Sequence, residues 1–333
     1  MTLLSFTERL RRRFTGSISP ARGGDVEFCV LAEAGVLEAQ ALLLCSSIRR
    51  FAGAYSSAAV VVVSPRPDRR PCRTTLRDLD CMGVEYVELD IRSPYPSFGP
   101  SFKILAVAHI SRRPGPPIIV QIDSDTLFLG EPDFTLDGVD VAARPVDLKG
   151  MCTAGEGDPF DEFWHNLCAL CEVDYARVPV LETTVDRKAV RASYNGGLVV
   201  AKRNRGILER TAEFLERALI ADARPHRGSV VLVRSGAGAV SAEASEYWGI
   251  GQALLSLAIS ATDSKVRILP TSHNVPIQFL DLLERSDTTP VHVHYHWLCS
   301  SEECSANPML DGRMALPPDT VKWLRERLPL TTP

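Results

Sequence analysis

The 333-residue chain is 45% apolar and 23% charged, an ordinary composition for a globular protein with a substantial core. Its 37 basic and 41 acidic residues give a formal charge of −4, so no nucleic acid partner is expected. Nine scattered cysteines, set mostly in apolar segments, indicate reduced buried thiols rather than a disulfide framework. We therefore expect a cytoplasmic protein.

Residues 1–24 are predicted to form an N-terminal helix or tail before a single domain that spans residues 25–330. Within the tail, residues 3–14 combine apolar residues at helical spacing with a run of arginines. This segment either packs on the body of the protein or makes a peripheral contact with the inner membrane surface. The chain has no apolar run of the roughly 18 residues that a membrane span needs.

Predicted strands and helices alternate along the chain. In the first half, apolar runs predict strands at 27–31, 58–64, 84–90 and 116–123, with helices at 37–51, 74–83 and 103–111. The second half is less regular, with strands at 138–145, 196–203, 266–270 and 291–297 and helices at 161–173, 206–221 and 247–260. Continuous apolar strands separated by helices indicate an α/β fold. We predict a single Rossmann-like, mostly parallel sheet flanked by helices, with an elaborated C-terminal half.

Two carboxylates follow the strand predicted at 116–123. Asp123 and Asp125 lie where this strand ends, and ligands in such sheets bind beyond the C-terminal ends of the strands. Two hard oxygen ligands near one point suit Mg²⁺ or Mn²⁺ held jointly with phosphate oxygens. The alternative is a turn in which aspartates cap backbone N–H groups.

Histidine occupies every second position of the strand predicted at 291–297. At this period His292, His294 and His296 face the same side of the strand. Imidazole is a common ligand of transition metals, so a ligand from this row favours Mn²⁺ over Mg²⁺. An exposed edge strand is the alternative.

The segment SYNGGLVVAKR places Asn195 and Gly196 immediately before a buried run. Glycine lets the backbone approach a ligand closely, and the amide of Asn195 can pair with hydroxyl groups. Asn-Gly also occurs as a simple turn.

In this order, the segments resemble nucleotide-sugar-dependent glycosyltransferases of the A-type fold with a DxD motif. The resemblance is greatest to the branch that contains glycogenin and bacterial lipopolysaccharide galactosyl- and glucosyltransferases. It runs through most of the chain, from FCVLAEAG and SFKILAVAHI through IIVQIDSDTLFLGEPDF and SYNGGLVVAKR to YWGIGQALLSLAI, LPTSHNVP and VHVHYHW. It implies transfer of a sugar from a nucleotide-diphosphate sugar, first of all a UDP-sugar, to an acceptor hydroxyl, with retention.

The resemblance also implies roles for individual residues. Asp123 and Asp125, with His294 or His296, would hold Mn²⁺ or Mg²⁺ against the donor diphosphate. The donor would further contact a set of residues along the same sheet edge: Ala32, Glu33, Lys103, Ser124, Asn195, Gly196 and Trp248. The residues implied at the reaction centre are Gln252, Asn195 and Glu246.

Two departures from the branch leave the stereochemistry and the stabilisation of the leaving group open. Gly251 precedes Gln252 where the branch often has an acid, and WLCSSEEC replaces the lysine-bearing glycine motif after the histidines. If the reaction inverts, a carboxylate must accept the acceptor proton, and the candidates are Asp147, Glu243 and Glu246.

Residues 25–135 are expected to form the nucleotide-binding half and residues 136–330 the acceptor-binding half. The expected acceptor is a carbohydrate, a lipid-linked molecule or a protein. Two alternative functions are a catalytically inactive nucleotide-sugar-binding relative and a sugar nucleotidylyltransferase. The second needs a Gly-rich, Arg-bearing loop after the first strand, and AEAGVLEAQ is not one.

Overall fold

The computed structural model of the chain describes residues 23–229, 231, 234–283 and 289–331. The helix predicted at residues 3–14 lies outside the described residues. Among the described residues, no helix combines the length and apolar character needed to cross a membrane.

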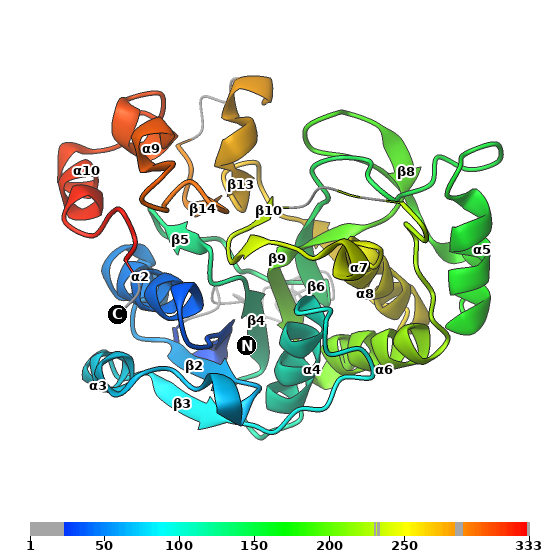
Figure 1. The fold of residues 1–333 in the computed structure, drawn as a ribbon, viewed down its shortest axis with the longest axis horizontal. Helices are drawn as coiled ribbons and strands as arrows, with labels where there is room; N and C mark the ends of the chain where they lie inside the picture. The colour runs from blue at the N-terminus through cyan, green and yellow to red at the C-terminus, as the bar shows by residue number, and fades with distance from the viewer. Residues whose placement is uncertain (1–22, 230, 232–233, 284–288, 332–333) are drawn as a thin grey trace, which may run out of the picture.

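A seven-stranded sheet forms the centre of the fold (Figure 1). From edge to edge its strands are β12 (Val266–Ile268), β6 (Val141–Pro145), β9 (Tyr194–Lys202), β4 (Ile118–Ile122), β1 (Val26–Leu31), β2 (Ala59–Ser64) and β3 (Glu85–Glu88). β1 pairs in parallel with β2 and β4, β2 with β3, and β6 with β12. β9 runs antiparallel to both of its neighbours. The prediction of an α/β fold with a mostly parallel sheet is confirmed.

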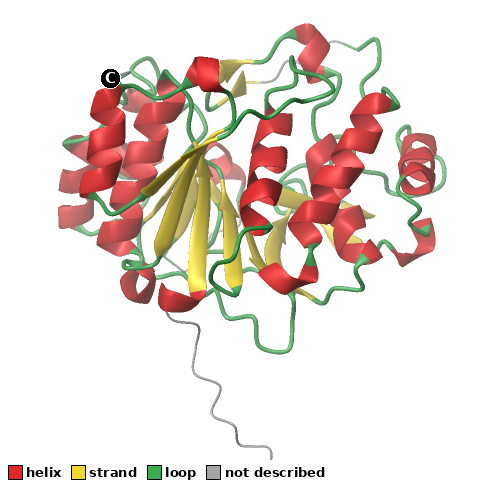
Figure 2. Cartoon of the chain, turned by 90° about the horizontal axis from the view of Figure 1, so that it is seen from below, coloured by secondary structure: helices red, strands yellow, loops and turns green. Residues whose placement is uncertain are grey.

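Helices cover both faces of this sheet, as Figure 2 shows. One face packs on α2 (Val36–Phe51) and α3 (Arg73–Cys81), and the other on α4 (Pro100–Ser111), α5 (Asp161–Leu170), α6 (Ile207–Ile220) and α8 (Ile250–Ala261). In β1, Phe28 and Val30 join the first apolar layer and Cys29 joins the second. Burying each such side chain is worth about 1.5–3 kcal/mol. Two buried faces therefore explain why the strands read as unbroken apolar runs.

A smaller sheet extends from the end of β4. It contains β13 (Val275–Pro276), β14 (His292–His294) and β5 (Thr126–Phe128), in that order. A third apolar cluster joins this sheet to α9 (Pro308–Asp311) and α10 (Pro318–Arg325), and it reaches α2 through Leu43. β5 follows β4 after a three-residue turn, so Asp123 and Asp125 lie at the junction of the two sheets.

The remaining elements are short. They are the pair β7 (Val180–Glu182) and β8 (Ala189–Arg191), the hairpin β10 (Arg234–Ser235) and β11 (Gly238–Ala239), helix α7 (Ala242–Ser245), and the 3-10 helices η1 (Gly23–Asp25), η2 (Gly53–Tyr55), η3 (Pro67–Arg69), η4 (Tyr175–Arg177), η5 (Arg203–Arg205), η6 (Ile277–Leu282) and η7 (Cys304–Ala306).

Two predicted elements differ from the structure in ways that affect the site. The strand predicted at 291–297 ends at His294, because His296 has a left-handed backbone with a φ of 50°. The helix predicted at 247–260 begins only at Ile250, after Gly249 with a φ of 87°. All nine cysteines are free thiols, and seven of them are buried. Strands from both predicted halves, 25–135 and 136–330, pair within the central sheet.

Candidate active site

The turn between β4 and β5 is fixed by backbone hydrogen bonds. The N–H of Asp123 donates to the carbonyl of Gly197 on β9 at 3.0 Å, and the hydroxyl of Thr126 donates to the carbonyl of Asp123 at 2.7 Å. The carbonyl of Asp125 accepts from the N–H of Tyr295 at 3.0 Å. These bonds place both aspartates at the C-terminal end of β4, beside the chain that leaves β14.

Asp125, His294 and His296 form a cluster of potential metal ligands. One ligand atom from each of the three lies within 4.8 Å of the others. Nε2 of His294 is 3.2 Å from Oδ1 of Asp125 and 4.0 Å from Oδ2 of Asp123, and Nδ1 of His296 is 3.9 Å from Oδ2 of Asp125. Carboxylate oxygens and imidazole nitrogens at this spacing fit one divalent cation.

The third histidine of the row points elsewhere. Nδ1 of His292 accepts a hydrogen bond from the N–H of Asn274 at 3.2 Å, and its ring lies 4.7 Å from that of Phe128. Of the three histidines that the sequence left as alternatives, the structure therefore brings His294 and His296 to Asp125, and not His292.

The pKa values of the two clustered histidines are shifted in opposite directions. Burial alone would raise the pKa of Asp125 and lower that of His294, but their mutual attraction reverses both shifts. Burial, with repulsion from His294, lowers the pKa of His296 to about 3. Nδ1 of His296 is buried and has no hydrogen-bond partner among the described residues. A neutral imidazole with an unpaired buried nitrogen beside a carboxylate fits a metal ligand.

Lys103, Asp123 and Gly196, all predicted at the donor, come together. The ammonium of Lys103 forms an ion pair with Oδ1 of Asp123 and donates to the carbonyl of Gly196 at 3.3 Å. That carbonyl also accepts from Nε2 of Gln121 at 3.0 Å. A side chain from α4 thus reaches the ends of β4 and β9 at one point.

Asn195 lies in a buried hydrogen-bonded chain next to the cluster. Its Oδ1 accepts from the N–H of Gly197 at 2.8 Å and its Nδ2 donates to Asp147 at 3.0 Å. The other oxygen of Asp147 accepts from the hydroxyl of Thr184 at 2.7 Å, and burial raises the pKa of Asp147. A Cβ added at Gly197 would lie 2.8 Å from the His294 ring. The backbone of β9 therefore sets the position of that imidazole.

Ser124 faces away from these groups, toward α2. Its hydroxyl donates to Oε1 of Gln40 at 2.9 Å, and Nε2 of Gln40 donates to the carbonyl of Gly236 at 2.8 Å. Gln40 was not predicted. A polar residue on the buried face of the helix expected at 37–51 is the signal that could have identified it.

Ala32 and Glu33 lie at the end of β1 and are buried. Ala32 is fully enclosed, and the carboxylate of Glu33 forms an ion pair with Arg66, one of its hydrogen bonds being 2.7 Å long. The guanidinium of Arg66 lies 4.2 Å from the centre of the Phe102 ring. The carboxylate that the sequence assigned to the nucleotide is therefore paired with a cation of the protein.

The structure does not join Glu246, Gln252 or Trp248 to the cluster through any contact of the described residues. Glu246 accepts from Arg224 at 2.8 Å and from the N–H of Gly228 at 3.0 Å, so both of its oxygens are engaged. Gln252 lies half-buried in the first turn of α8. Trp248 packs against the apolar layer that contains α4, α6 and α8.

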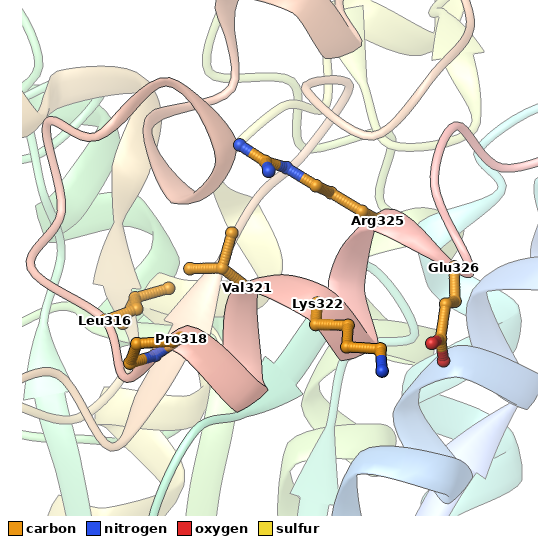
Figure 3. A pocket seen from close by; sticks show the side chains of 6 residues that line it. All are labelled: Leu316, Pro318, Val321, Lys322, Arg325 and Glu326. Carbon is orange, nitrogen blue, oxygen red and sulfur yellow. The ribbon is translucent and has the colours of Figure 1, made fainter.

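Two cavities of the described structure are lined by residues outside the cluster. One cavity, of about 560 Å³, lies beside α10, and Figure 3 shows its lining residues Leu316, Pro318, Val321, Lys322, Arg325 and Glu326. The other, about 270 Å³, lies beside the C-terminal part of α8 and contains none of the clustered residues.

The class of protein follows from comparison with known families: this α/β fold is that of a glycosyltransferase, an enzyme that transfers sugars. The chain belongs to the family described as the Rhodobacterales glycosyltransferase domain, whose model matches residues 28–229. The match includes Asp123, Asp125 and Asn195. The prediction of a glycosyltransferase is confirmed.

Solved glycosyltransferase structures show a distant likeness. The WbbM bifunctional glycosyltransferase is 14% identical with a TM-score of 0.49, and the match covers 95% of this chain and 54% of that one. The galactosyltransferase LgtC, solved with donor and acceptor sugar analogues, is 13% identical with a TM-score of 0.47, covering 90% of this chain and 96% of that one. Core-mannan synthase A from Aspergillus fumigatus, in a Mn/GDP form, is 8% identical with a TM-score of 0.45, covering 73% and 72%. No curated protein matched the chain.

Proposed function

We propose that the protein transfers a sugar from a nucleotide-diphosphate sugar, a UDP-sugar, to an acceptor hydroxyl, and that it depends on a divalent metal. Sugar transfer is the activity of the family. The observation that supports the metal is the meeting of Asp125 with His294 and His296, whose ligand atoms lie within 4.8 Å of one another.

In this proposal Asp125, His294 and His296 hold the ion, with Asp123 beside them. Two imidazoles among the ligands favour Mn²⁺ over Mg²⁺, which prefers oxygen ligands. When bound, the ion would neutralise charge on the departing diphosphate.

The chain's own polar groups would bind and orient the donor. Lys103 contacts both Asp123 and the Gly196 carbonyl, and its ammonium would pair with a phosphate oxygen or a sugar hydroxyl of the donor. Ser124, Asn195, Gly196, Gln252 and Trp248 keep the donor-side or reaction-centre roles that the resemblance implies. Ala32 and Glu33 would meet the nucleotide only after Arg66 releases the Glu33 carboxylate.

The hydrogen bonds of two of the three candidate bases, Asp147 and Glu246, support a retaining reaction, whereas the third, Glu243, is exposed. Asp147 bonds to Thr184 and Asn195, and Glu246 bonds to Arg224 and Gly228, so each carboxylate has both oxygens engaged. An inverting reaction needs a carboxylate free to take the acceptor proton. With retention the acceptor attacks on the face that the diphosphate leaves, and Glu246 then has only a structural role.

We further propose that residues 25–135 bind the nucleotide and residues 136–330 bind the acceptor, a carbohydrate free or lipid-linked. Short elements and their connections surround β7 and β8 and lie among the described residues between α6 and α8, and specificity contacts usually lie in such connections.

The test is turnover of UDP-glucose, UDP-galactose and GDP-mannose with Mn²⁺ and with EDTA, followed by NMR of the anomeric product. The variant is Asp125→Asn and the matched control is Asp281→Asn, an exposed carboxylate paired with Arg313. We expect Mn²⁺-dependent release of nucleotide from wild type and control, and loss of it in Asp125→Asn. Equal rates in EDTA would refute the metal. Donor binding without turnover would identify an inactive relative.

A further inference from the structure

The hairpin β10–β11 lies directly on the candidate metal cluster. A Cβ built on Gly236, in its turn, would lie 2.3 Å from Oδ2 of Asp125, so the backbone there packs against the carboxylate. Gln40 holds this turn through its bond to the Gly236 carbonyl at 2.8 Å and contacts Ser124 with its other end. Figure 1 shows β10 beside the junction of β5 and β14.

Arg234, in β10, carries the cation nearest to this turn within the hairpin. Its guanidinium pairs with Glu303 at 2.7 Å and with Glu302 at 3.7 Å, and lies 5.5 Å from the centre of a Trp297 ring. Trp297 in turn lies 5.7 Å from His296, centre to centre. The Trp297 ring therefore lies near both the guanidinium and a candidate metal ligand.

We propose that Arg234 binds the diphosphate of the donor nucleotide, and that Glu303 holds its guanidinium until the donor arrives. The inference rests on the proposed function, since it needs a diphosphate at the cluster. It names a binding residue in a segment that neither the motifs of the sequence nor the match to residues 28–229 contains.

The length of the Arg234 side chain and the net charge at the cluster both support replacement of Glu303 by a diphosphate as the partner of Arg234. Arg234 is two residues from Gly236, so their Cα atoms are within about 7 Å, a distance that an arginine side chain spans. At the cluster, the two carboxylates of Asp123 and Asp125 face one ammonium, Lys103. A divalent ion leaves this set with one positive charge, whereas a diphosphate diester brings two negative ones. A second protein cation completes the balance.

The present partner of Arg234 is easily given up. The side chains of Arg234 and Glu303 are 42% and 34% exposed, and ion pairs that reach solvent contribute little to stability. A guanidinium binds phosphate oxygens through two parallel hydrogen bonds, which are stronger than such surface pairs. The diphosphate should therefore displace Glu303.

The test compares Arg234→Gln and Glu303→Gln by binding rather than turnover. The probes are UDP, UMP and GDP in the presence of Mn²⁺, measured by calorimetry and by tryptophan fluorescence. Arg234→Gln should weaken UDP or GDP binding about tenfold and reduce the preference for UDP over UMP. Glu303→Gln, which removes the competitor, should tighten diphosphate binding about threefold.

Arg313→Gln is the matched control, because Arg313 is also 42% exposed and paired with two acids, Asp281 and Asp311. It should bind as wild type does. Binding of UDP or GDP should change the fluorescence of Trp297 as the guanidinium leaves it, and Trp297→Phe should remove that signal.

The outcomes separate the two proposals. If wild type binds UDP or GDP and Arg234→Gln binds equally well with an unchanged melting temperature, this inference is wrong and the proposed function is unaffected. If wild type binds neither nucleotide, the proposed function is wrong and the inference with it.

Discussion

Gly197 provides a direct test of whether His294 is a metal ligand. A Cβ at this position would lie 2.8 Å from Cε1 and Nδ1 of His294, whereas ordinary contacts begin at 3.4 Å. Gly197→Ala must therefore move the imidazole by about 0.6 Å, or move the strand β9 instead. Metal–ligand distances tolerate only about 0.2 Å. We expect Mn²⁺ affinity to fall about 10- to 100-fold, as it does when support for a ligand is lost.

Gly196→Ala is the matched control, since a Cβ there would meet Gln121 and Lys103 at ordinary distances of 3.5 and 3.6 Å. Mn²⁺ affinity is measured by electron paramagnetic resonance of the free ion, and stability by urea unfolding. Overpacking in Gly197→Ala should also cost about 1–3 kcal/mol of unfolding free energy. Equal Mn²⁺ affinity in the two alanine variants would refute the assignment of His294.

Two further predictions concern stability. Arg203 donates to the carbonyls of Ile110, Ser111 and Arg113 at the end of α4, and to Glu27 at 2.6 Å. Arg203→Lys keeps the charge but loses the several N–H donors of the guanidinium, so urea unfolding should show a loss of about 2–3 kcal/mol of unfolding free energy. The control Arg210→Lys, at a partly exposed position, should show almost no loss. A similar loss in both variants would contradict this role of Arg203. Burial lowers the pKa of His273 from 6.5 to about 4. The unfolded chain then binds a proton that the folded chain does not, so stability is complete above pH 6.5 and is lost as the pH falls toward 4. Between pH 7 and 5 the loss is about 2 kcal/mol, and His273→Gln, which keeps an acceptor for the N–H of Asp133, should lack it. An identical pH dependence in the variant would show that His273 titrates normally.

The fold was predictable because its signal is local. A strand that is buried on both faces of a sheet has an unbroken apolar sequence. β1, β2 and β4 have such sequences and lie between segments with helical periodicity, so they are recognised as buried strands. The order of strands and the antiparallel direction of β9 depend on contacts between distant segments, and no local pattern encodes them.

The types of residue that could bind a metal were predictable from the sequence, but the contacts that these residues make were less so. The two aspartates are identified by their position at the end of an apolar run, and the histidines by their occurrence at every second position. That period was nevertheless a false guide to His296, whose left-handed backbone, rather than strand alternation, turns its ring toward Asp125. Gln40 joins Ser124 to Gly236 across 196 positions of sequence, so its role exists only in the folded chain.

Three cations of the proposed donor site already have counter-charges within the chain. Lys103 pairs with Asp123, Arg66 with Glu33, and Arg234 with Glu303. Lys103 and Arg66 are largely buried and need such partners when no ligand is present, because an unpaired buried charge costs several kcal/mol, whereas Arg234 is more exposed. Donor binding would then replace one set of ion pairs with another rather than create new ones. The affinity for the donor would depend on the difference between the two sets of ion pairs. A change of Glu303 should therefore alter how tightly a diphosphate binds, although Glu303 itself is not expected to contact the donor.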